Sequence, residues 1–112
     1  MPDFKAGAVV RVPFPYTDRD TRQYRPALVV SDGAIGPDRA LLWVAMITSA
    51  TNRRWEDDVS LEADHAKAGL PVPSLIRTAK IATIDAAAAQ TIGALDAARL
   101  AEVRKMIAQH LG

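Results

Sequence analysis

The pattern of apolar and polar positions predicts a succession of strands through the first half of the chain. Residues 7–14 are rich in valine and indicate a first strand, and residues 26–31 indicate a second. Residues 40–49 indicate a third, whose centre shows no polar alternation. Both faces of that strand are therefore expected to be covered, and in a domain this small the second cover can be another copy of the chain.

The second half of the chain predicts two more strands and a return to extended structure near residue 92. A short alternating strand is expected over residues 59–62 and a longer one over residues 74–84. Asp85 is placed to cap one helical turn over residues 86–90, before the chain becomes extended again over residues 91–93. These strands follow one another without a long helix between them, which is typical of antiparallel pairing.

The last segment predicts an amphipathic helix that begins after Asp96, a good N-cap residue. Several short strands followed by one helix indicate a mainly β fold with α, of the α+β class. We expect a small, strongly bent antiparallel sheet or barrel with the helix packed on it. Apolar residues at helical spacing form the stripe that would face the sheet: Leu100, Val103, Ile107 and Leu111.

Composition narrows the class of protein without identifying it. The chain has 112 residues, a size that predicts a single domain over residues 1–112. Its net charge of +1 gives no global field that favours nucleic acid, and the absence of cysteine excludes disulfides and thiolate chemistry. No membrane segment or signal region is apparent, so we expect a cytoplasmic protein. His65 and His110 have no acidic or cysteine pattern around them, so neither a metal nor another cofactor is predicted.

The candidate chemistry lies at the strand ends. Pro26 restrains the backbone of Arg25. This would hold the guanidinium at the start of a rigid strand, a position suited to the recognition of phosphate. In an antiparallel meander the start of one strand lies beside the end of the next, so Arg25 can meet Thr48 and Ser49 at one rim. Hydroxyls at strand ends also commonly bond the backbone, which is the alternative for Thr48 and Ser49. Arg77, in the later strand, is either a second phosphate contact or an exposed residue in a weak ion pair.

Basic and aromatic residues interleave in two loops that flank these strands. Arginine neutralises phosphate, and an exposed ring offers a base a stacking platform. Acidic residues occur in the same loops, so a charge-balanced solvated surface is the alternative, and the tryptophan can instead fold back onto the core. The candidate RNA contacts in these loops are Arg22, Tyr24, Arg53, Arg54 and Trp55.

Several pieces of the sequence, taken in order, resemble the MazF/PemK family of toxin endoribonucleases. The first strand and its exit, residues 7–18, are followed by Arg-Pro-Ala-Leu-Val-Val-Ser over residues 25–31 and Ile-Thr-Ser over residues 47–49. The resemblance continues through shorter pieces into the last helix and covers nearly the whole chain. The shorter pieces are Ala68-Gly69-Leu70, Pro73-Ser74, Ile76-Arg77, Lys80-Ile81, Thr83-Ile84 and Ile92-Gly93-Ala94-Leu95.

This resemblance implies a compact SH3-like barrel that forms a homodimer and is neutralised by a cognate antitoxin protein. It implies cleavage of single-stranded RNA at short sequences without a metal, leaving a cyclic phosphate and a free 5′ hydroxyl. The catalytic arginine of the family falls on Arg25 and its threonine on Thr48, with Ser49 as a neighbouring contact. Arg77 matches an arginine that some members use, but the acidic or amide residue two positions later is Ala79 here. That departure puts in doubt a mechanism with a side-chain base at this position.

Two other functions are compatible with the same fold. A related toxin binds and inhibits DNA gyrase without cutting RNA, and an inactive RNA-binding or protein-interaction module would keep Arg25 only as a phosphate contact. Cleavage of naked RNA distinguishes the endoribonuclease from both alternatives.

Overall fold

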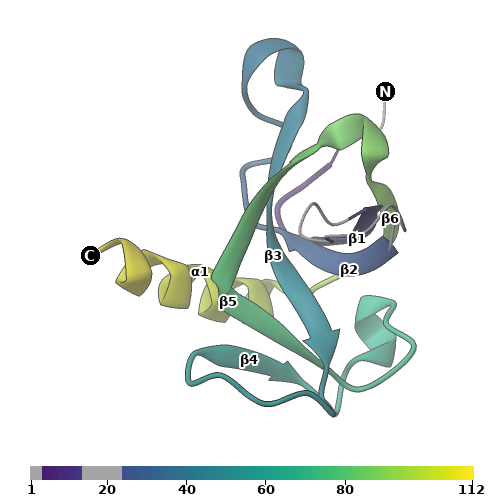
Figure 1. Cartoon of the computed structure of the whole chain (residues 1–112), viewed down its shortest axis with the longest axis vertical. Helices are drawn as coiled ribbons and strands as arrows, with labels where there is room; N and C mark the ends of the chain where they lie inside the picture. The colour runs from purple at the N-terminus through teal and green to yellow at the C-terminus, as the bar shows by residue number, and fades with distance from the viewer. Residues whose placement is uncertain (1–3, 14–23) are drawn as a thin grey trace.

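The computed structural model describes residues 4–13 and 24–112 as one curled antiparallel sheet followed by a helix (Figure 1). The sheet has six strands in the order β4-β5-β3-β2-β1-β6 and closes into a half-barrel, so the predicted fold class, a small SH3-like antiparallel barrel with a C-terminal amphipathic helix, is confirmed. The strands are β1 (Ala8–Pro13), β2 (Tyr24–Val29), β3 (Leu41–Ser49), β4 (Asp58–Leu61), β5 (Ser74–Asp85) and β6 (Gln90–Ala94). The helical elements are the 3₁₀ turns η1 (Pro37–Arg39), η2 (Ala66–Ala68) and η3 (Ala86–Ala88), and the helix α1 (Ala97–Leu111).

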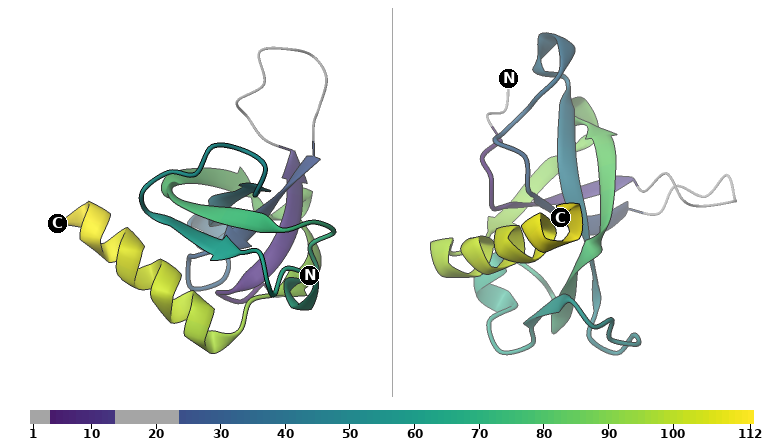
Figure 2. Two further views of the ribbon diagram at one scale, coloured as in Figure 1. Left: turned by 90° about the horizontal axis from the view of Figure 1, so that it is seen from below. Right: turned by 90° about the vertical axis from the view of Figure 1, so that its left-hand side faces the viewer.

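Alternate residues of the strands supply two hydrophobic cores, one on each face of the sheet. The helix covers one face, where Val103 is fully buried, and Figure 2 shows α1 lying along that side of the strands. We call the two clusters the barrel core and the helix-side core. The barrel core comprises Phe4, Val10, Val12, Ala27, Val29, Leu42, Val44, Ala82 and Ile84. The helix-side core comprises Val9, Leu28, Ala45, Ile47, Val59, Leu61, Ala68, Leu70, Ile76 and Val103.

Helix α1 begins where the sequence predicts. The Asp96 carboxylate accepts a hydrogen bond from the backbone N–H of Arg99 over 2.8 Å, which satisfies one of the free donors of the first turn. Hydrogen bonds to Asp64 and Glu102 raise the pKa of the Arg99 guanidinium above its ordinary value. The bond to Asp64 also connects the helix to the loop before η2. The apolar stripe is shorter than predicted, because Leu111 is 84% exposed where the helix runs past the sheet (Figure 2).

Two glycines allow η2 to lie directly against β6. A Cβ atom on Gly69 would collide with the carbonyl oxygen of Ile92, and one on Gly93 would collide with the carbonyl oxygen of Ala68. Gly69 also has a φ of +84°, which other residues rarely adopt. The two backbones therefore meet without side chains between them, and this contact draws the loop after β4 onto the far edge of the sheet.

Two details of the predicted elements need correction. Strand β2 begins at Tyr24, before the predicted start, because its first residues pair with β1. The expectation for β3 stays untested, since Trp43 is 51% exposed in a single chain and a second copy could cover it. The turn after β5 is a 3₁₀ turn that follows Asp85 as predicted, but the Asp85 side chain makes no capping hydrogen bond.

Candidate functional site

The two predicted catalytic residues, Arg25 and Thr48, occupy the same end of neighbouring strands β2 and β3. Ala27 on β2 pairs with Met46 on β3. Because the two strands are antiparallel, Arg25, two residues before Ala27, lies at the same end of the sheet as Thr48, two residues after Met46. Arg25 pairs with Val12, a barrel-core residue, so its side chain belongs to the barrel-core face. Met46 packs against the same core, and Thr48 follows two residues later on the same face. The register therefore places both residues on one rim, as the meander predicts.

Arg77 comes to the same face through a register shift in β5. Ala45 pairs with Ile81, but the next residue, Met46, pairs with Arg77, so β5 shifts by three residues at this point. Figure 1 shows β5 bending in its middle, as expected for a large bulge. Because successive strand residues face opposite sides, a shift by an odd number turns Arg77 toward the face that Met46 occupies. The site thus has an arginine on each side of β3.

The Arg77 side chain is buried and held from three directions. Its Nη2 donates to the backbone carbonyl of Arg53 over 2.9 Å, and its Nη1 lies 3.7 Å from Oδ2 of Asp58. The guanidinium lies over the Trp55 ring, with 4.0 Å between Cζ and the ring centroid. Nη1 is buried and makes no hydrogen bond within the described part of the chain. Among the described residues, Arg77 thus has one donor atom with no acceptor at hydrogen-bond distance.

This arrangement resolves the interpretations left open for Arg77 and Trp55. Arg77 is 7% exposed and makes several contacts, so it is not an exposed strand residue in a weak surface pair. Trp55 folds back onto Arg77 and still exposes 42% of its surface, so covering Arg77 leaves part of the indole open to a ligand. An RNA-binding role for either residue stays a prediction.

Asp58 was not singled out by the sequence as a site residue. Its carboxylate is almost fully buried and also accepts the backbone N–H of Trp55 over 2.8 Å. It therefore fixes both the backbone that carries the indole and the guanidinium beneath it. The available signal was its position as the first residue of β4, where a carboxylate directly precedes an apolar strand.

The hydroxyls of Thr48 and Ser49 have different partners. Oγ of Ser49 accepts the backbone N–H of Thr51 over 3.3 Å and lies 2.9 Å from that residue's hydroxyl, so it serves the turn, as the alternative interpretation expects. Oγ1 of Thr48 instead accepts from the side-chain amide of Asn52 over 2.6 Å. Thr48 is 8% exposed, and its hydroxyl belongs to a side-chain pair. The sequence did not single out Asn52, because an asparagine in a loop is compatible with many turns.

Tyr24 lies on the other face of β2 from Arg25. It pairs with Pro13 and stacks with Arg11, whose Cζ lies 5.3 Å from the ring centroid. Because neighbouring strand residues alternate in direction, the structure does not group Tyr24 with Arg25 on the barrel-core face. Among the remaining predicted contacts, Arg53 and Arg54 are exposed in the loop between β3 and β4, and Arg22 lies outside the described residues.

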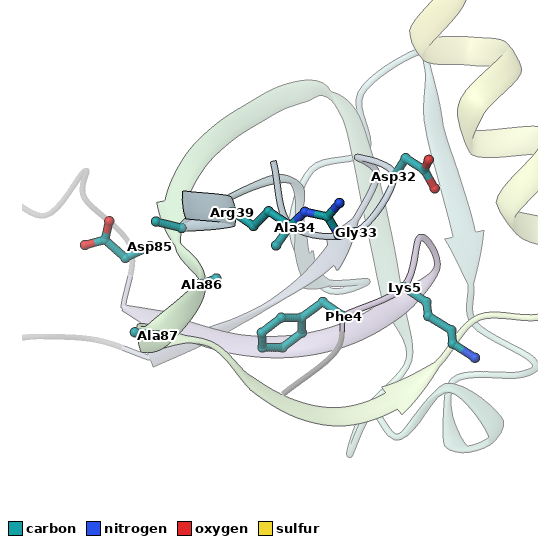
Figure 3. A pocket seen from close by; sticks show the side chains of 10 residues that line it. Phe4, Lys5, Asp32, Gly33, Ala34, Arg39, Asp85, Ala86 and Ala87 are labelled. Atoms are coloured by element: carbon teal, nitrogen blue, oxygen red, sulfur yellow. The ribbon is translucent and has the colours of Figure 1, made fainter. Parts of the chain in front are cut away.

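A cavity among the described residues lies elsewhere, and none of the predicted site residues lines it. Its volume is about 670 Å³. Figure 3 shows Phe4 and Arg39 facing across it, with Lys5 and Asp32 on one side and the segment from Asp85 on the other. The candidate site is instead a surface at the rim of the sheet, which suits an extended polymer better than an enclosed small molecule.

Within 4–13 and 24–112, no group of three or more histidine, aspartate or glutamate side chains is arranged to hold a metal ion. The helices of this part of the chain are all too short or too polar to cross a membrane.

Comparison with known families gives a match over nearly the whole chain. A family model described as "PemK-like, MazF-like toxin of type II toxin-antitoxin system" matches residues 5–111. Comparison with curated protein sequences finds no match.

Solved structures with the same fold include several toxins. MazF (form I) from Deinococcus radiodurans is similar with a TM-score of 0.78 and 26% identity, covering 100% of this chain and 99% of that one. The MazE–MazF complex (form II) from the same organism is similar with a TM-score of 0.76 and 25% identity, covering 100% and 98%. An endoribonuclease in complex with its cognate antitoxin from a mycobacterial species has a TM-score of 0.73 at 18% identity, covering 100% and 96%, and shows the fold alone.

Proposed function

This chain belongs to the PemK-like, MazF-like family of toxins of type II toxin–antitoxin systems, and from that premise we propose that it cuts single-stranded RNA at specific short sequences without a metal ion. MazF-like toxins are generally endoribonucleases. The observation that carries the proposal is the strand register, which gives Arg25 and Thr48 one face and one rim. A guanidinium and a hydroxyl side by side are suited to a phosphate whose charge increases during reaction.

The proposed reaction is an attack of a ribose 2′ oxygen on the adjacent phosphorus. A new bond forms between the 2′ oxygen and phosphorus, the bond from phosphorus to the 5′ oxygen breaks, and the products are a 2′,3′-cyclic phosphate and a 5′ hydroxyl. The 2′ hydroxyl gives its proton to water, and the departing 5′ oxygen takes one from its donor, which regains a proton from water. Arg25 stabilises the charge on the phosphoryl oxygens and is the proposed donor to the 5′ oxygen, and Thr48 holds the phosphate by hydrogen bonding.

Arg77 is proposed to support this centre from the next strand. Its guanidinium is buried beside Asp58 and Trp55, so it supplies fixed positive charge at low mobility. Because Nη1 is buried beside Asp58, Arg77 is proposed to act on the RNA through its positive charge and not by direct contact from this atom. In this role Arg77 needs no side-chain base two residues later, so Ala79 is compatible with it.

The proposed RNA path follows the exposed side chains around the rim. Trp55 presents the exposed part of its indole to a base, a contact worth about 1 to 3 kcal/mol in other single-strand binding proteins. Arg53 and Arg54 contact the backbone of the RNA, and Ser49 contacts the phosphate beside Thr48. Arg22 and Tyr24 are further proposed RNA contacts, with Tyr24 on the face of β2 opposite Arg25.

The proposed partners are a cognate antitoxin and a second copy of the chain, in the cytoplasm. The similarity to the MazE–MazF complex supports an antitoxin partner. Trp43 and Ile81 support the homodimer, because both are exposed apolar side chains on neighbouring strands. Ala45 pairs with Ile81 and lies two residues from Trp43, which puts the two exposed side chains on one face.

The test is cleavage of a mixed-sequence single-stranded RNA by the purified chain in EDTA, followed by mapping of the fragment ends. We expect discrete cuts with cyclic phosphate ends, lost in Arg25→Ala. Arg39→Ala is the matched control, since it removes an exposed arginine that lines the separate cavity. No cutting by the folded parent chain, or cutting by Arg25→Ala at the parental rate, would reject the assignment. In the first case, binding to DNA gyrase or to RNA becomes the function to test.

A further inference from the structure

The turn after β3 returns the chain over Thr48. The backbone N–H of Asn52 donates to the carbonyl of Ser49 over 3.0 Å, which closes a four-residue turn. The hydroxyl of Ser49 accepts from Thr51 inside the same turn, and the N–H of Ala50 donates to the carbonyl of Pro73 over 2.9 Å. The turn is therefore fixed both internally and to the segment before β5.

This fixed turn directs one side chain onto the proposed site. Nδ2 of Asn52 lies 2.6 Å from Oγ1 of Thr48, and the amide nitrogen donates. An amide NH₂ group has no acceptor capacity, so at this contact the Thr48 oxygen is the acceptor. A threonine hydroxyl has only one proton, and that proton must then point away from Asn52. The hydrogen bond thus leaves the Thr48 O–H free to donate to a ligand.

The same contact also makes the hydroxyl a better donor. A group that accepts one hydrogen bond is polarised to donate the next more strongly. Because Thr48 is nearly buried, few water molecules compete for its oxygen. Asn52 itself is exposed, so its removal deletes this hydrogen bond without emptying a core position.

We propose that Asn52 is a positioning residue for RNA cleavage, which orients the Thr48 hydroxyl as a hydrogen-bond donor to the phosphate. The inference rests on the proposed function, since Thr48 has this role only if the chain cuts RNA. Asn52 acts through Thr48 and makes no contact of its own with the reacting atoms.

Five variants test the inference: Asn52→Ala, Asn52→Asp, Thr48→Val, and the two double variants that combine Thr48→Val with Asn52→Ala or with Asn52→Asp. The readouts are the single-turnover cleavage rate on an RNA that the parent chain cuts, and the affinity for the same RNA with a 2′-deoxy sugar at the cleavage position. Loss of one donor to a charged transition state costs about 10²- to 10³-fold in rate, which is the effect expected for Thr48→Val. Loss of orientation alone is expected to cost less, about tenfold for Asn52→Ala, with affinity within about twofold of the parent.

The double variant with Asn52→Ala separates action through Thr48 from a direct effect of Asn52 on RNA. If Asn52 works only by orienting the hydroxyl, Asn52→Ala has no further effect once Thr48→Val has removed that hydroxyl. Asn52→Asp keeps a similar shape, but its carboxylate can only accept hydrogen bonds. The Thr48 hydroxyl would then donate to this carboxylate instead of to the phosphate, so cleavage by Asn52→Asp should be slower than cleavage by Asn52→Ala. The effect of the added negative charge on the cleavage rate is measured separately with the double variant Asn52→Asp and Thr48→Val. This variant has no Thr48 hydroxyl, so only the effect of the charge persists.

Each result has one meaning for the inference. Asn52→Ala or Asn52→Asp that cuts within about twofold of the parent rate overturns it, as does an equal effect of Asn52→Ala with and without the Thr48 hydroxyl. Thermal unfolding midpoints of all variants establish that they fold, and Asn52→Asp provides a second test if Asn52→Ala is unstable. A folded parent chain that cuts no RNA rejects the proposed function, and this inference with it. A parent that cuts while the Asn52 variants match it rejects this inference alone.

Discussion

The guanidinium of Arg77 lies over the indole of Trp55, with 4.0 Å between its central carbon and the ring centroid. The charge is buried and the ring is partly exposed, so the tryptophan separates an arginine of the proposed site from water. Interactions of this kind are worth about 0.5 to 2 kcal/mol, more when the cation is desolvated.

Trp55→Ala is therefore expected to lower the free energy of unfolding by about 1 to 2 kcal/mol, because it removes the ring and admits water to a buried charge. Trp55→Phe keeps a smaller ring over Arg77, so it should lose only about half as much free energy of unfolding as Trp55→Ala. Urea denaturation measures both values. Equal stability of parent and Trp55→Ala would mean that the ring covers Arg77 without stabilising it.

Asp58 is expected to be more important for folding than for cleavage. Asp58→Ala leaves the buried Arg77 cation without its carboxylate and should cost about 3 to 5 kcal/mol. Asp58→Asn keeps an acceptor for the Trp55 N–H and should cost less. The double variant Asp58→Leu with Arg77→Met removes both charges together and should recover much of the loss, measured by denaturant unfolding. A double variant no more stable than Asp58→Ala would show that the pair is not the source of the effect.

The exposed arginines of the loop between β3 and β4 should act on RNA through charge alone. Arg53→Ala and Arg54→Ala each remove one phosphate contact, so each should reduce the slope of log affinity against log salt by about 0.7. The Arg53 backbone carbonyl still accepts from Arg77 in its variant, so stability should be unchanged. Arg104→Ala on α1 is the control. If the slope of log affinity against log salt is the same in Arg53→Ala, Arg54→Ala and Arg104→Ala, the RNA does not contact the loop between β3 and β4.

The exposed apolar residues on the face formed by β3 and β5 should mediate self-association. Trp43→Lys places a charge at the centre of this patch and is expected to convert a dimer into a folded monomer, because burial of an unpaired ammonium is costly. Sedimentation at several protein concentrations gives the oligomeric state. A Trp43→Lys protein that remains dimeric would move the interface to another surface.

The order and class of the elements could be predicted because they depend on local pattern. Valine-rich runs, the Asp96 cap and the strand succession each need only neighbouring residues. The opposite faces of Tyr24 and Arg25 follow from the same alternation, once the start of β2 is fixed.

The contacts of the site could not be predicted in the same way. The three-residue shift in β5 decides which side Arg77 faces, and it depends on pairing with a distant strand. The placement of Asn52 over Thr48 depends on the conformation of one turn, which an asparagine in a loop does not specify. The exposure of Trp43 depends on what covers the sheet, and a single chain does not supply that cover.

The contact between Gly69 and Gly93 explains why two of the sequence pieces shared with toxins contain glycine. At both positions the requirement is the absence of a side chain where two backbones touch, and this requirement comes from shape alone. In this chain the pair serves the closure of the sheet and has no part in the proposed reaction with RNA. Those two pieces therefore indicate architecture and not activity, and a chain with both glycines but without Arg25 would keep this contact without the proposed chemistry.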